Sequence, residues 1–267
     1  METIVATQYI ASMQWTAIIL AGQRPGTDKI AAHFGMTYKA LVPLAGEPML
    51  THVVRTMNGH TRIGRVIILA QDIEVIAQAA HAGGGGELRQ SNDGISASLK
   101  ALLDSGDITW PWIVTTADHP LLTDAMISEF LDESEGDLSV GMVERRAMLA
   151  QFPGAKRTWL RFAGGAWSGA NLFAFRSANV APVLTLWAAA EKDRKQAWKL
   201  FLHFGPWLAL RAITRTITLP DAFAAAGKRL GLSAHMVSMT DPVAAIDVDK
   251  PEDHALASSI FATRRGL

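Results

Sequence analysis

The chain has 267 residues, of which 49% are hydrophobic and 19% are charged, so it is long enough to bury a substantial core and is not a disordered chain. Its 25 Lys and Arg residues balance 25 Asp and Glu residues, which argues against a general nucleic-acid-binding protein, since such proteins carry an excess of basic charge. The absence of cysteine excludes disulfides, thiolate metal sites and thiol catalysis, and it suits a cytoplasmic protein.

The beginning of the chain predicts no secretory signal. Residues 1–14 lack a basic segment followed by a long apolar one, and we expect them to be a poorly ordered lead-in to a single domain. No stretch reaches the about 18 consecutive apolar residues of a spanning helix. We therefore expect one domain over residues 1–267 and no transmembrane segment.

Apolar runs alternate with helical patterns in the first half of the chain. The runs typical of buried parallel strands are residues 16–20, 65–70 and 112–116. The expected helices are residues 48–57, 73–82, 95–103 and 124–131. This alternation predicts right-handed β-α-β crossovers and a mainly parallel sheet.

The pattern changes after residue 135. Residues 137–143 and 171–175 predict two further strands. The following stretch is mostly helical, with an internal break at Gly205-Pro206, and we interpret residues 181–240 as a helical insertion. A last helix is expected to begin near Pro251.

A basic loop with several glycines follows the first expected strand. It contains Gly22, Arg24 and Gly26, and a lone lysine, Lys39, comes before the next apolar segment. Such a loop offers backbone N–H groups and positive charge to phosphates. It is neither a G-x-G-x-x-G dinucleotide motif nor a Walker A loop. Lys39 is therefore either a phosphate-binding residue or a solvated surface charge.

Acidic residues follow two of the apolar runs. Asp118 comes just after the run at 112–116, where ligands bind in open parallel sheets, although it could instead only cap the next helix. Asp247 and Asp249 follow the run at 243–246 and, as strand residues, would point to the same side. Two carboxylates there suit a hard divalent cation, while acids at a helix start also favour its dipole.

Four short motifs occur in order along the chain. They are Leu-Ala-Gly-x-Arg from Leu20, Lys-Ala-Leu-x-Pro-Leu-Ala-Gly-Glu-Pro-Met-Leu from Lys39, Ala-Asp-x-Pro-Leu-Leu from Ala117, and Asp-Val-Asp-x-Pro-Glu-Asp from Asp247. Together they resemble the MobA-like nucleotidyltransferases over residues 16–131 and 166–258. The resemblance implies an α/β fold: a Rossmann-like three-layer α/β/α sandwich of the glycosyltransferase-A kind, with a mostly parallel mixed sheet and the helical insertion near 181–240.

The resemblance also implies roles for individual residues. The catalytic residues would be Lys39, Arg24 and Asp118. The ligands of Mg²⁺, or of Mn²⁺ in its place, would be Asp118, Asp249 and Asp247. The nucleotide-binding residues would be Leu20, Ala21, Gly22, Arg24, Lys39, Gly94, Ser96, Ser98 and Ala117. Gly169 and Asn171 would lie near the acceptor.

The implied reaction is Mg²⁺-dependent transfer of an NMP unit from an NTP to a phosphorylated small molecule, with release of pyrophosphate. An acceptor phosphate is already a nucleophile near neutral pH, so no general base is needed. One alternative is a nucleotide-sugar-dependent glycosyltransferase of the same fold, which Asp118-His-Pro disfavours because it lacks the second acid of an Asp-x-Asp motif. Another is a non-catalytic nucleotide-binding protein. We expect a monomer or a homodimer.

The expected insertion is basic and contains several tryptophans. Residues 181–235 hold eight Lys or Arg against three acids, a net charge of +5, together with Trp187, Trp198 and Trp207. Such a stretch could lie on an anionic membrane or recognise an anionic, lipid-linked acceptor. It could equally cover the sheet, with its tryptophans in the core and its charges in solvent, and we favour this second interpretation.

Overall fold

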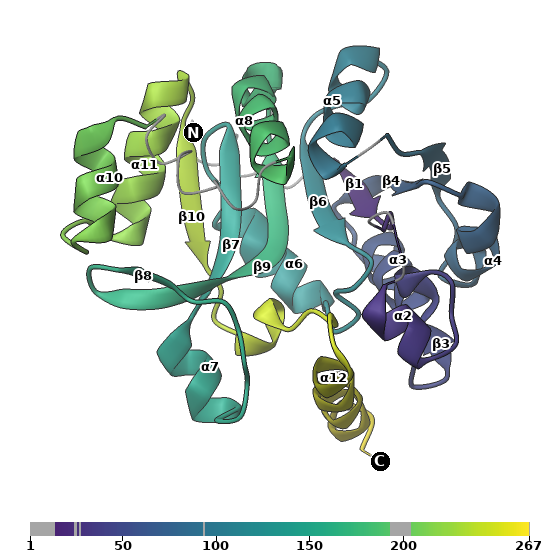
Figure 1. The fold of residues 1–267 in the computed structure, drawn as a ribbon. Helices are drawn as coiled ribbons and strands as arrows, with labels where there is room; N and C mark the ends of the chain where they lie inside the picture. Colours follow the sequence, from purple (N-terminus) through teal and green to yellow (C-terminus); the bar gives the residue numbers. More distant parts are fainter. Residues whose placement is uncertain (1–13, 24–25, 27, 93, 193–203, 267) are drawn as a thin grey trace, which may run out of the picture.

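The computed structural model describes residues 14–23, 26, 28–92, 94–192 and 204–266 (Figure 1). The strands are β1 (Trp15–Leu20), β2 (Pro43–Leu44), β3 (Glu47–Pro48), β4 (Ile63–Ala70), β5 (Glu87–Gln90), β6 (Trp112–Thr116), β7 (Leu138–Glu144), β8 (Leu160–Phe162), β9 (Gly165–Phe175) and β10 (Ala234–Ser238). The α-helices are α2 (Lys29–His33), α3 (Met49–Gly59), α4 (Ile73–Ala82), α5 (Ile95–Ser105), α6 (Asp124–Asp132), α7 (Arg145–Gln151), α8 (Ala181–Lys192), α10 (Pro206–Ile213), α11 (Leu219–Leu230) and α12 (Pro251–Arg264). Short 3₁₀ helices are η1 (Lys39–Leu41), η2 (Ala178–Val180) and η4 (Pro242–Ala245).

An eight-stranded mixed sheet forms the centre of the molecule. Its strands follow the order β10-β7-β9-β6-β1-β4-β5, and β8 pairs with β9. Strand β1 is parallel to β4 and β6, and β10 is parallel to β7, whereas β9 is antiparallel to β6, β7 and β8. The predicted mostly parallel sheet is confirmed. Because β1, β4 and β6 run the same way, their carboxyl ends share one edge of the sheet.

Helices cover both faces of this sheet (Figure 1). All six residues of β1 are buried, which explains why its sequence reads as a continuous apolar run. Ala17 and Ile19 belong to the core beneath α3, α6 and α12, while Ile18 and Leu20 belong to a second core beneath α5 and α8. The alternation of side chains along one strand thus supplies both cores, and the three-layer α/β/α sandwich is confirmed.

The expected end of the helical insertion is wrong. Residues 181–240 do contain the helices α8, α10 and α11, but residues 234–238 form β10, which pairs with β7 at the edge of the main sheet. Met236 and Val237 are buried there, so this strand belongs to the sandwich. Of the expected lead-in at residues 1–14, residues 1–13 lie outside the described residues, and so does the segment 193–203.

The apolar run before Asp247 is also not a strand. Residues 242–245 form the 3₁₀ helix η4, because Pro242 starts a helical turn well and the Asp241 carboxylate accepts the Val243 N–H at 2.9 Å. Within the described residues, no helix is both long enough and apolar enough to cross a membrane.

Candidate active site

Side-chain hydrogen bonds hold the loop that follows β1. The Gln23 N–H donates to Gln71 Oε1 at 2.9 Å, and Gln71 Nε2 donates to the Gln23 carbonyl at 3.0 Å. Gln23 Oε1 accepts the backbone N–H of Lys39 at 3.1 Å. On the other side of Lys39, the Tyr38 hydroxyl accepts the Asp72 N–H at 3.1 Å. These bonds tie Lys39 to the ends of β1 and β4.

The ammonium group of Lys39 lies between two carboxylates. Nζ donates to Asp118 Oδ2 at 2.5 Å and also to Asp249 Oδ1. Only 16% of the Lys39 side chain is exposed. Burial disfavours the charged form, but the charges of Asp118 and Asp249 outweigh it, so the pKa of Lys39 is raised. Lys39 is therefore a positive charge at the carboxyl-terminal edge of the sheet.

Two chain segments bring Asp118 and Asp249 together. Asp118 follows the end of β6, and its Oδ1 accepts the hydroxyl proton of Thr116 at 2.5 Å. The Val248 N–H donates to the Asp118 carbonyl at 2.9 Å, and the Val248 side chain is fully buried. Because Val248 points into the core, Asp247 and Asp249 on either side of it point outward in this extended segment, as alternation predicts although no strand forms.

Asp247 is paired with a different basic residue, Arg157. Arg157 Nη2 donates to Asp247 Oδ1 and to the Ala245 carbonyl, and Nη1 lies 3.6 Å from Asp253 Oδ1. Asn171 Nδ2 donates to Asp247 Oδ2 at 3.1 Å. Asp247 is thus held by Arg157 and Asn171, whereas Asp118 and Asp249 share the ammonium of Lys39.

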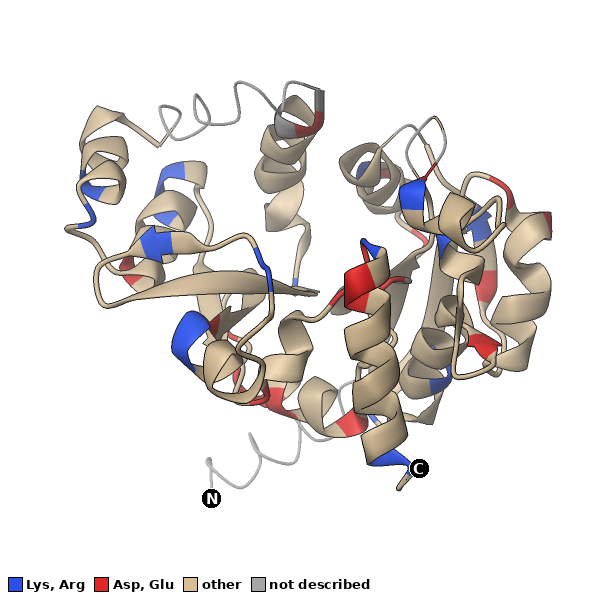
Figure 2. Cartoon of the chain, turned by 60° about the horizontal axis from the view of Figure 1, so that its bottom comes forward, with Lys and Arg blue, Asp and Glu red and all other residues tan. Residues whose placement is uncertain are grey.

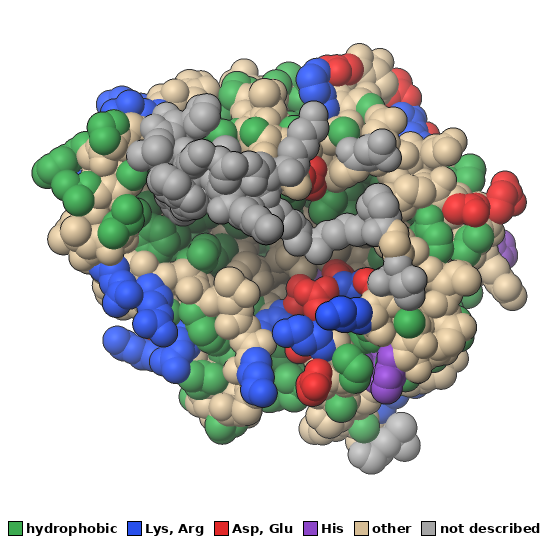
Figure 3. Space-filling view, in the orientation of Figure 1, with side chains coloured by type: hydrophobic (Ala, Val, Ile, Leu, Met, Phe, Trp, Pro, Cys, Tyr) green, Lys and Arg blue, Asp and Glu red, His purple; other side chains and the backbone are tan. Residues whose placement is uncertain are grey.

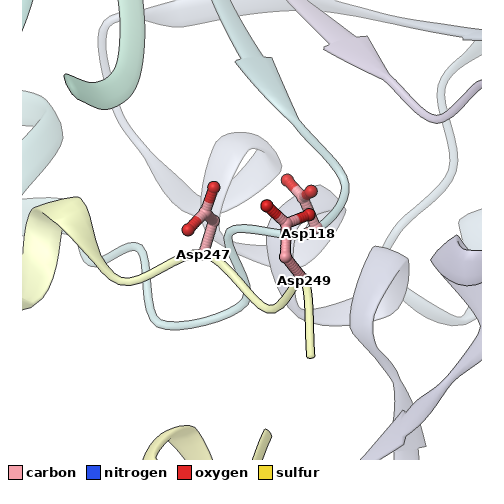
Figure 4. Close-up of side chains that lie close together, drawn as sticks. All are labelled: Asp118, Asp247 and Asp249. Carbon is pink, nitrogen blue, oxygen red and sulfur yellow. The ribbon is translucent and has the colours of Figure 1, made fainter. Parts of the chain in front are cut away.

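The three aspartates form a donor set suited to a hard divalent cation. One oxygen from each of Asp118, Asp247 and Asp249 lies within 4.8 Å of the others (Figure 4). Carboxylate oxygens are the ligands that Mg²⁺ prefers, and the ammonium of Lys39 already stands in for a cation between two of them. These residues therefore fit the metal that the sequence predicts.

Most of the predicted nucleotide-binding residues next to the strands lie at this same edge. Leu20 ends β1 and Ala117 directly follows β6, and the Ala117 N–H donates to the Leu20 carbonyl at 3.0 Å. Ala21 bonds to the end of β4 through Leu69 at 2.8 Å, and the exposed Gly22 follows it. Arg24 lies outside the described residues.

The predicted Gly94–Ser98 segment begins α5. Gly94 has φ +97°, a conformation that glycine adopts without strain. Ser98 is buried, and its hydroxyl donates to the Gly94 carbonyl at 2.8 Å. The Ser96 hydroxyl donates to Glu191 Oε2 at 2.5 Å, and the same carboxylate accepts the Ile95 N–H at 3.2 Å. Glu191 of α8 thus caps α5 at the segment expected to contact the nucleotide.

The predicted acceptor residues lie on β9. Gly169 is opposite Met142 of β7, and the backbone of Asn171 is in the left-handed region, with φ +50°. The pairing of β7 and β9 is irregular between Val140 and Met142. This irregularity accompanies the unusual backbone of Asn171, whose side chain reaches Asp247.

Three polar residues of this region were missed by the sequence analysis. Gln71 comes directly after β4, so the rule that ligands bind at strand ends could have identified it. Arg157 and Glu191 lie in no recognisable motif, and only long-range contacts reveal them.

Next to Asp118, burial lowers the pKa of His119 to about 4, so this histidine is neutral at pH 7.

A comparison with protein-family models matches residues 17–201 to the MobA-like NTP transferase domain. The chain belongs to this family. The resemblance stated from the four sequence motifs is thereby confirmed.

Known proteins show how far the similarity of this MobA-like chain extends. A 3-deoxy-manno-octulosonate cytidylyltransferase of Geotalea uraniireducens is 34% identical over 109 residues, which are 39% of this chain and 41% of the relative. The match thus spans less than half of that relative's length. A solved structure described as a hypothetical transferase from Thermus thermophilus is 26% identical, with a TM-score of 0.75 over 91% of this chain and 100% of the other.

More distant structures share the fold. A 4-diphosphocytidyl-2C-methyl-D-erythritol synthase from Anaerococcus prevotii has a TM-score of 0.59 and 12% identity over 95% of this chain and 98% of the other. At this identity the likeness extends to the fold alone, and it places this MobA-like domain among nucleotidyltransferase folds.

Proposed function

We propose that this protein is a nucleotidyltransferase that moves an NMP unit from an NTP to a phosphorylated small molecule and releases pyrophosphate. The observation that carries the proposal is the convergence of Lys39, Asp118 and Asp249 at the carboxyl ends of β1 and β6. Membership in the MobA-like NTP transferase family supports it.

Charge balance supports a divalent cation in this reaction. Three carboxylates lie close together, and a triphosphate brought to them would be repelled unless positive charge is added. Asp118 and Asp249 would hold Mg²⁺ or Mn²⁺, with Asp247 beside them. Such an ion, when bound, polarises phosphoryl oxygens and offsets the charge of the triphosphate.

Lys39 would change partners when substrate binds. Its ammonium now lies between the two carboxylates that we assign to the cation. Phosphate oxygens of the NTP offer an alternative partner at the same edge, so the ammonium would move from the carboxylates to the triphosphate. There it would stabilise the charge that develops on the transferred phosphoryl group.

The chemical step requires little covalent help from the protein. An oxygen of the acceptor phosphate forms a bond to the α-phosphorus, while the bond from the α-phosphorus to the bridging oxygen breaks and its electron pair leaves with pyrophosphate. No proton has to move, so the protein's task is to position the groups and balance charge. Arg157 and Asn171 contribute by holding Asp247 in place on the β9 side.

Pyrophosphate release tests the proposal. The protein is incubated with each of the four NTPs, a panel of phosphorylated acceptors, and Mg²⁺ or EDTA. CTP is the first nucleotide to try, because the Geotalea relative is a cytidylyltransferase. We expect release that needs one NTP, one acceptor class and the metal. A protein that no NTP stabilises in a Mg²⁺-containing thermal-shift screen, and that releases no pyrophosphate, would refute the proposal.

A further inference from the structure

The helix α10 turns a row of large apolar side chains toward solvent. Trp207 is 68% exposed, Leu210 49% and Ile213 78%. They follow one another at intervals of three residues, so they lie along one side of the helix. Among the described residues, six large hydrophobic side chains are exposed, and half of them belong to this helix. Such a concentration marks an interaction surface.

The tryptophans of the expected insertion therefore have different roles. Trp187 of α8 packs against the core beneath α5 and α8, as we expected for all of them. For Trp207 that expectation is wrong, because most of its ring is in solvent. Trp198 lies outside the described residues.

The other side of α10 is anchored to the molecule. Ala209 of α10 is buried, unlike the three exposed side chains. Gly205 lies against the guanidinium of Arg229 in α11, where an added Cβ would be 2.8 Å from it. The exposed row thus lies on a helix whose opposite side packs against the molecule, and we call this row the α10 ridge.

Positive charge surrounds this ridge. Arg211 lies in the last turn of α10, and Arg215 follows the helix. Residues 204–232 contain four basic side chains and a single acid, Asp221, which accepts a hydrogen bond from the Thr218 hydroxyl at 2.6 Å. Figure 3 shows hydrophobic side chains over α10 at the left edge and a group of basic side chains below them.

We propose that the α10 ridge, made of Trp207, Leu210 and Ile213 with Arg211 and Arg215, docks on an anionic lipid membrane surface. A helix lying in the interface would bury its apolar side chains at the boundary of the headgroups, where tryptophan is favoured. The two arginines would remain among anionic headgroups. This surface is separate from the Lys39 site and goes beyond the transfer reaction.

The charge pattern favours a membrane over a second copy of the chain. In a two-fold interface the same patch occurs on both partners. Two α10 ridges facing each other would bring Arg211 and Arg215 close to the same arginines of the other copy, which is unfavourable. An anionic bilayer provides both the apolar layer and the opposite charge.

Vesicle flotation of the full chain tests this proposal. The vesicles contain phosphatidylcholine alone or phosphatidylcholine with phosphatidylserine, and each set is measured at low and high salt. We expect binding only when phosphatidylserine is present, and weaker binding at high salt because salt screens the arginines. Equal binding to both kinds of vesicle, or binding to neither, would overturn the proposal.

Two substitutions locate the binding surface. Ile213→Ser should lower the partition coefficient at least about tenfold, since a buried isoleucine contributes that much, whereas Val75→Ser on the exposed face of α4 should not change it. Arg211→Gln should lower it about fivefold. Lys100→Gln on α5, which removes the same charge elsewhere, is the matched control. Thermal melting checks that each variant is folded.

Two results would overturn the proposed membrane-docking role of the α10 ridge. If Ile213→Ser binds vesicles as well as the unaltered chain, α10 is not the docking element. If sedimentation shows a dimer that Ile213→Ser dissociates while vesicles bind neither protein, the ridge is an interface between copies. Pyrophosphate release in solution should be unchanged in Ile213→Ser, so failure of the membrane proposal and failure of the transferase proposal are separable.

Discussion

Two cations hold acidic side chains at the same edge of the sheet, and they do so differently. Lys39 presents one nitrogen to Asp118 and to Asp249, whose side chain is 57% exposed. The Arg157 side chain is 10% exposed, and its guanidinium has four acceptors: the Asp247 carboxylate and carbonyl, the Ala245 carbonyl and, at 3.6 Å, Asp253. Figure 2 shows acidic and basic groups at the start of α12, where these segments meet.

The difference separates a replaceable cation from a fixed one. A guanidinium is a rigid fork of donors, so one that already has several acceptors would lose them by moving. A lysine is a point charge on a flexible stem and can change partners more easily. We therefore assign cation exchange to Asp118, Asp249 and Lys39, and the positioning of Asp247 to Arg157. The substitutions below test this division, beginning with the largest expected effect.

Asp118→Asn should lower the turnover rate about a thousandfold, because the neutral amide keeps the shape but loses the charge that would hold the proposed metal ion. The measurement is pyrophosphate release at saturating NTP and Mg²⁺. Asp104→Asn, at an exposed aspartate paired with Lys100 on α5, is the matched control and should keep full activity. An Asp118→Asn enzyme that retains its rate would refute the metal assignment.

Arg157→Met should lower the free energy of unfolding by about 3 kcal/mol, because it leaves the carboxylates of Asp247 and Asp253 without their buried partner. Urea denaturation at neutral pH measures the change. Arg146→Met, at an 83% exposed arginine on α7, should change stability by less than about 0.5 kcal/mol. Equal stabilities of the two variants would show that Arg157 is not a structural clamp.

The fold was predictable where burial alone determines the pattern. Strands β1, β4 and β6 are covered on both faces, so their sequences are continuous apolar runs. Strand β5, with the sequence Glu-Leu-Arg-Gln, lies at the sheet edge and has no such run. Strand β10 was assigned to the insertion because its pairing with β7 depends on tertiary contacts that no local pattern contains.

The site was predictable where topology determines position. Lys39 and Asp118 come together because the loops at the carboxyl ends of β1 and β6 share one edge. Asp249 reaches the same edge from the segment after η4, which the backbone bond from Val248 to Asp118 holds there. Arg157 and Glu191 could not be predicted, since their partners lie far along the chain. The sequence likewise predicts a basic, tryptophan-bearing stretch but not which of its tryptophans faces solvent.

Lys39→Met should bind Mn²⁺ at least about tenfold more tightly than the unaltered protein when no nucleotide is present, because the competing ammonium is gone. Electron paramagnetic resonance of free Mn²⁺ measures the affinity. In the unaltered protein, a nonhydrolysable NTP analogue should tighten Mn²⁺ binding, since phosphates draw Lys39 away from Asp118 and Asp249. Unchanged Mn²⁺ affinity in Lys39→Met would mean that the lysine and the metal do not share the site.

Two substitutions of Asn171 distinguish the role of its side chain in positioning Asp247 from the effect of its strained backbone on stability. Asn171→Ala and Asn171→Gly both remove the amide that contacts Asp247, so both should raise the KM for the acceptor to the same extent. The Asn171→Ala variant should in addition be about 1 kcal/mol less stable than Asn171→Gly, because φ is +50° at this position and alanine is strained there.

Ala45 is the backbone control for this pair, since it has φ +49° in the turn between β2 and β3, outside the acidic cluster. Ala45→Gly should gain a similar stability with no change in KM. Steady-state kinetics with the acceptor varied, combined with urea denaturation, distinguish the two effects. If Asn171→Gly keeps the KM of the unaltered protein, the amide does not position Asp247 for the acceptor, and Arg157 alone holds that carboxylate.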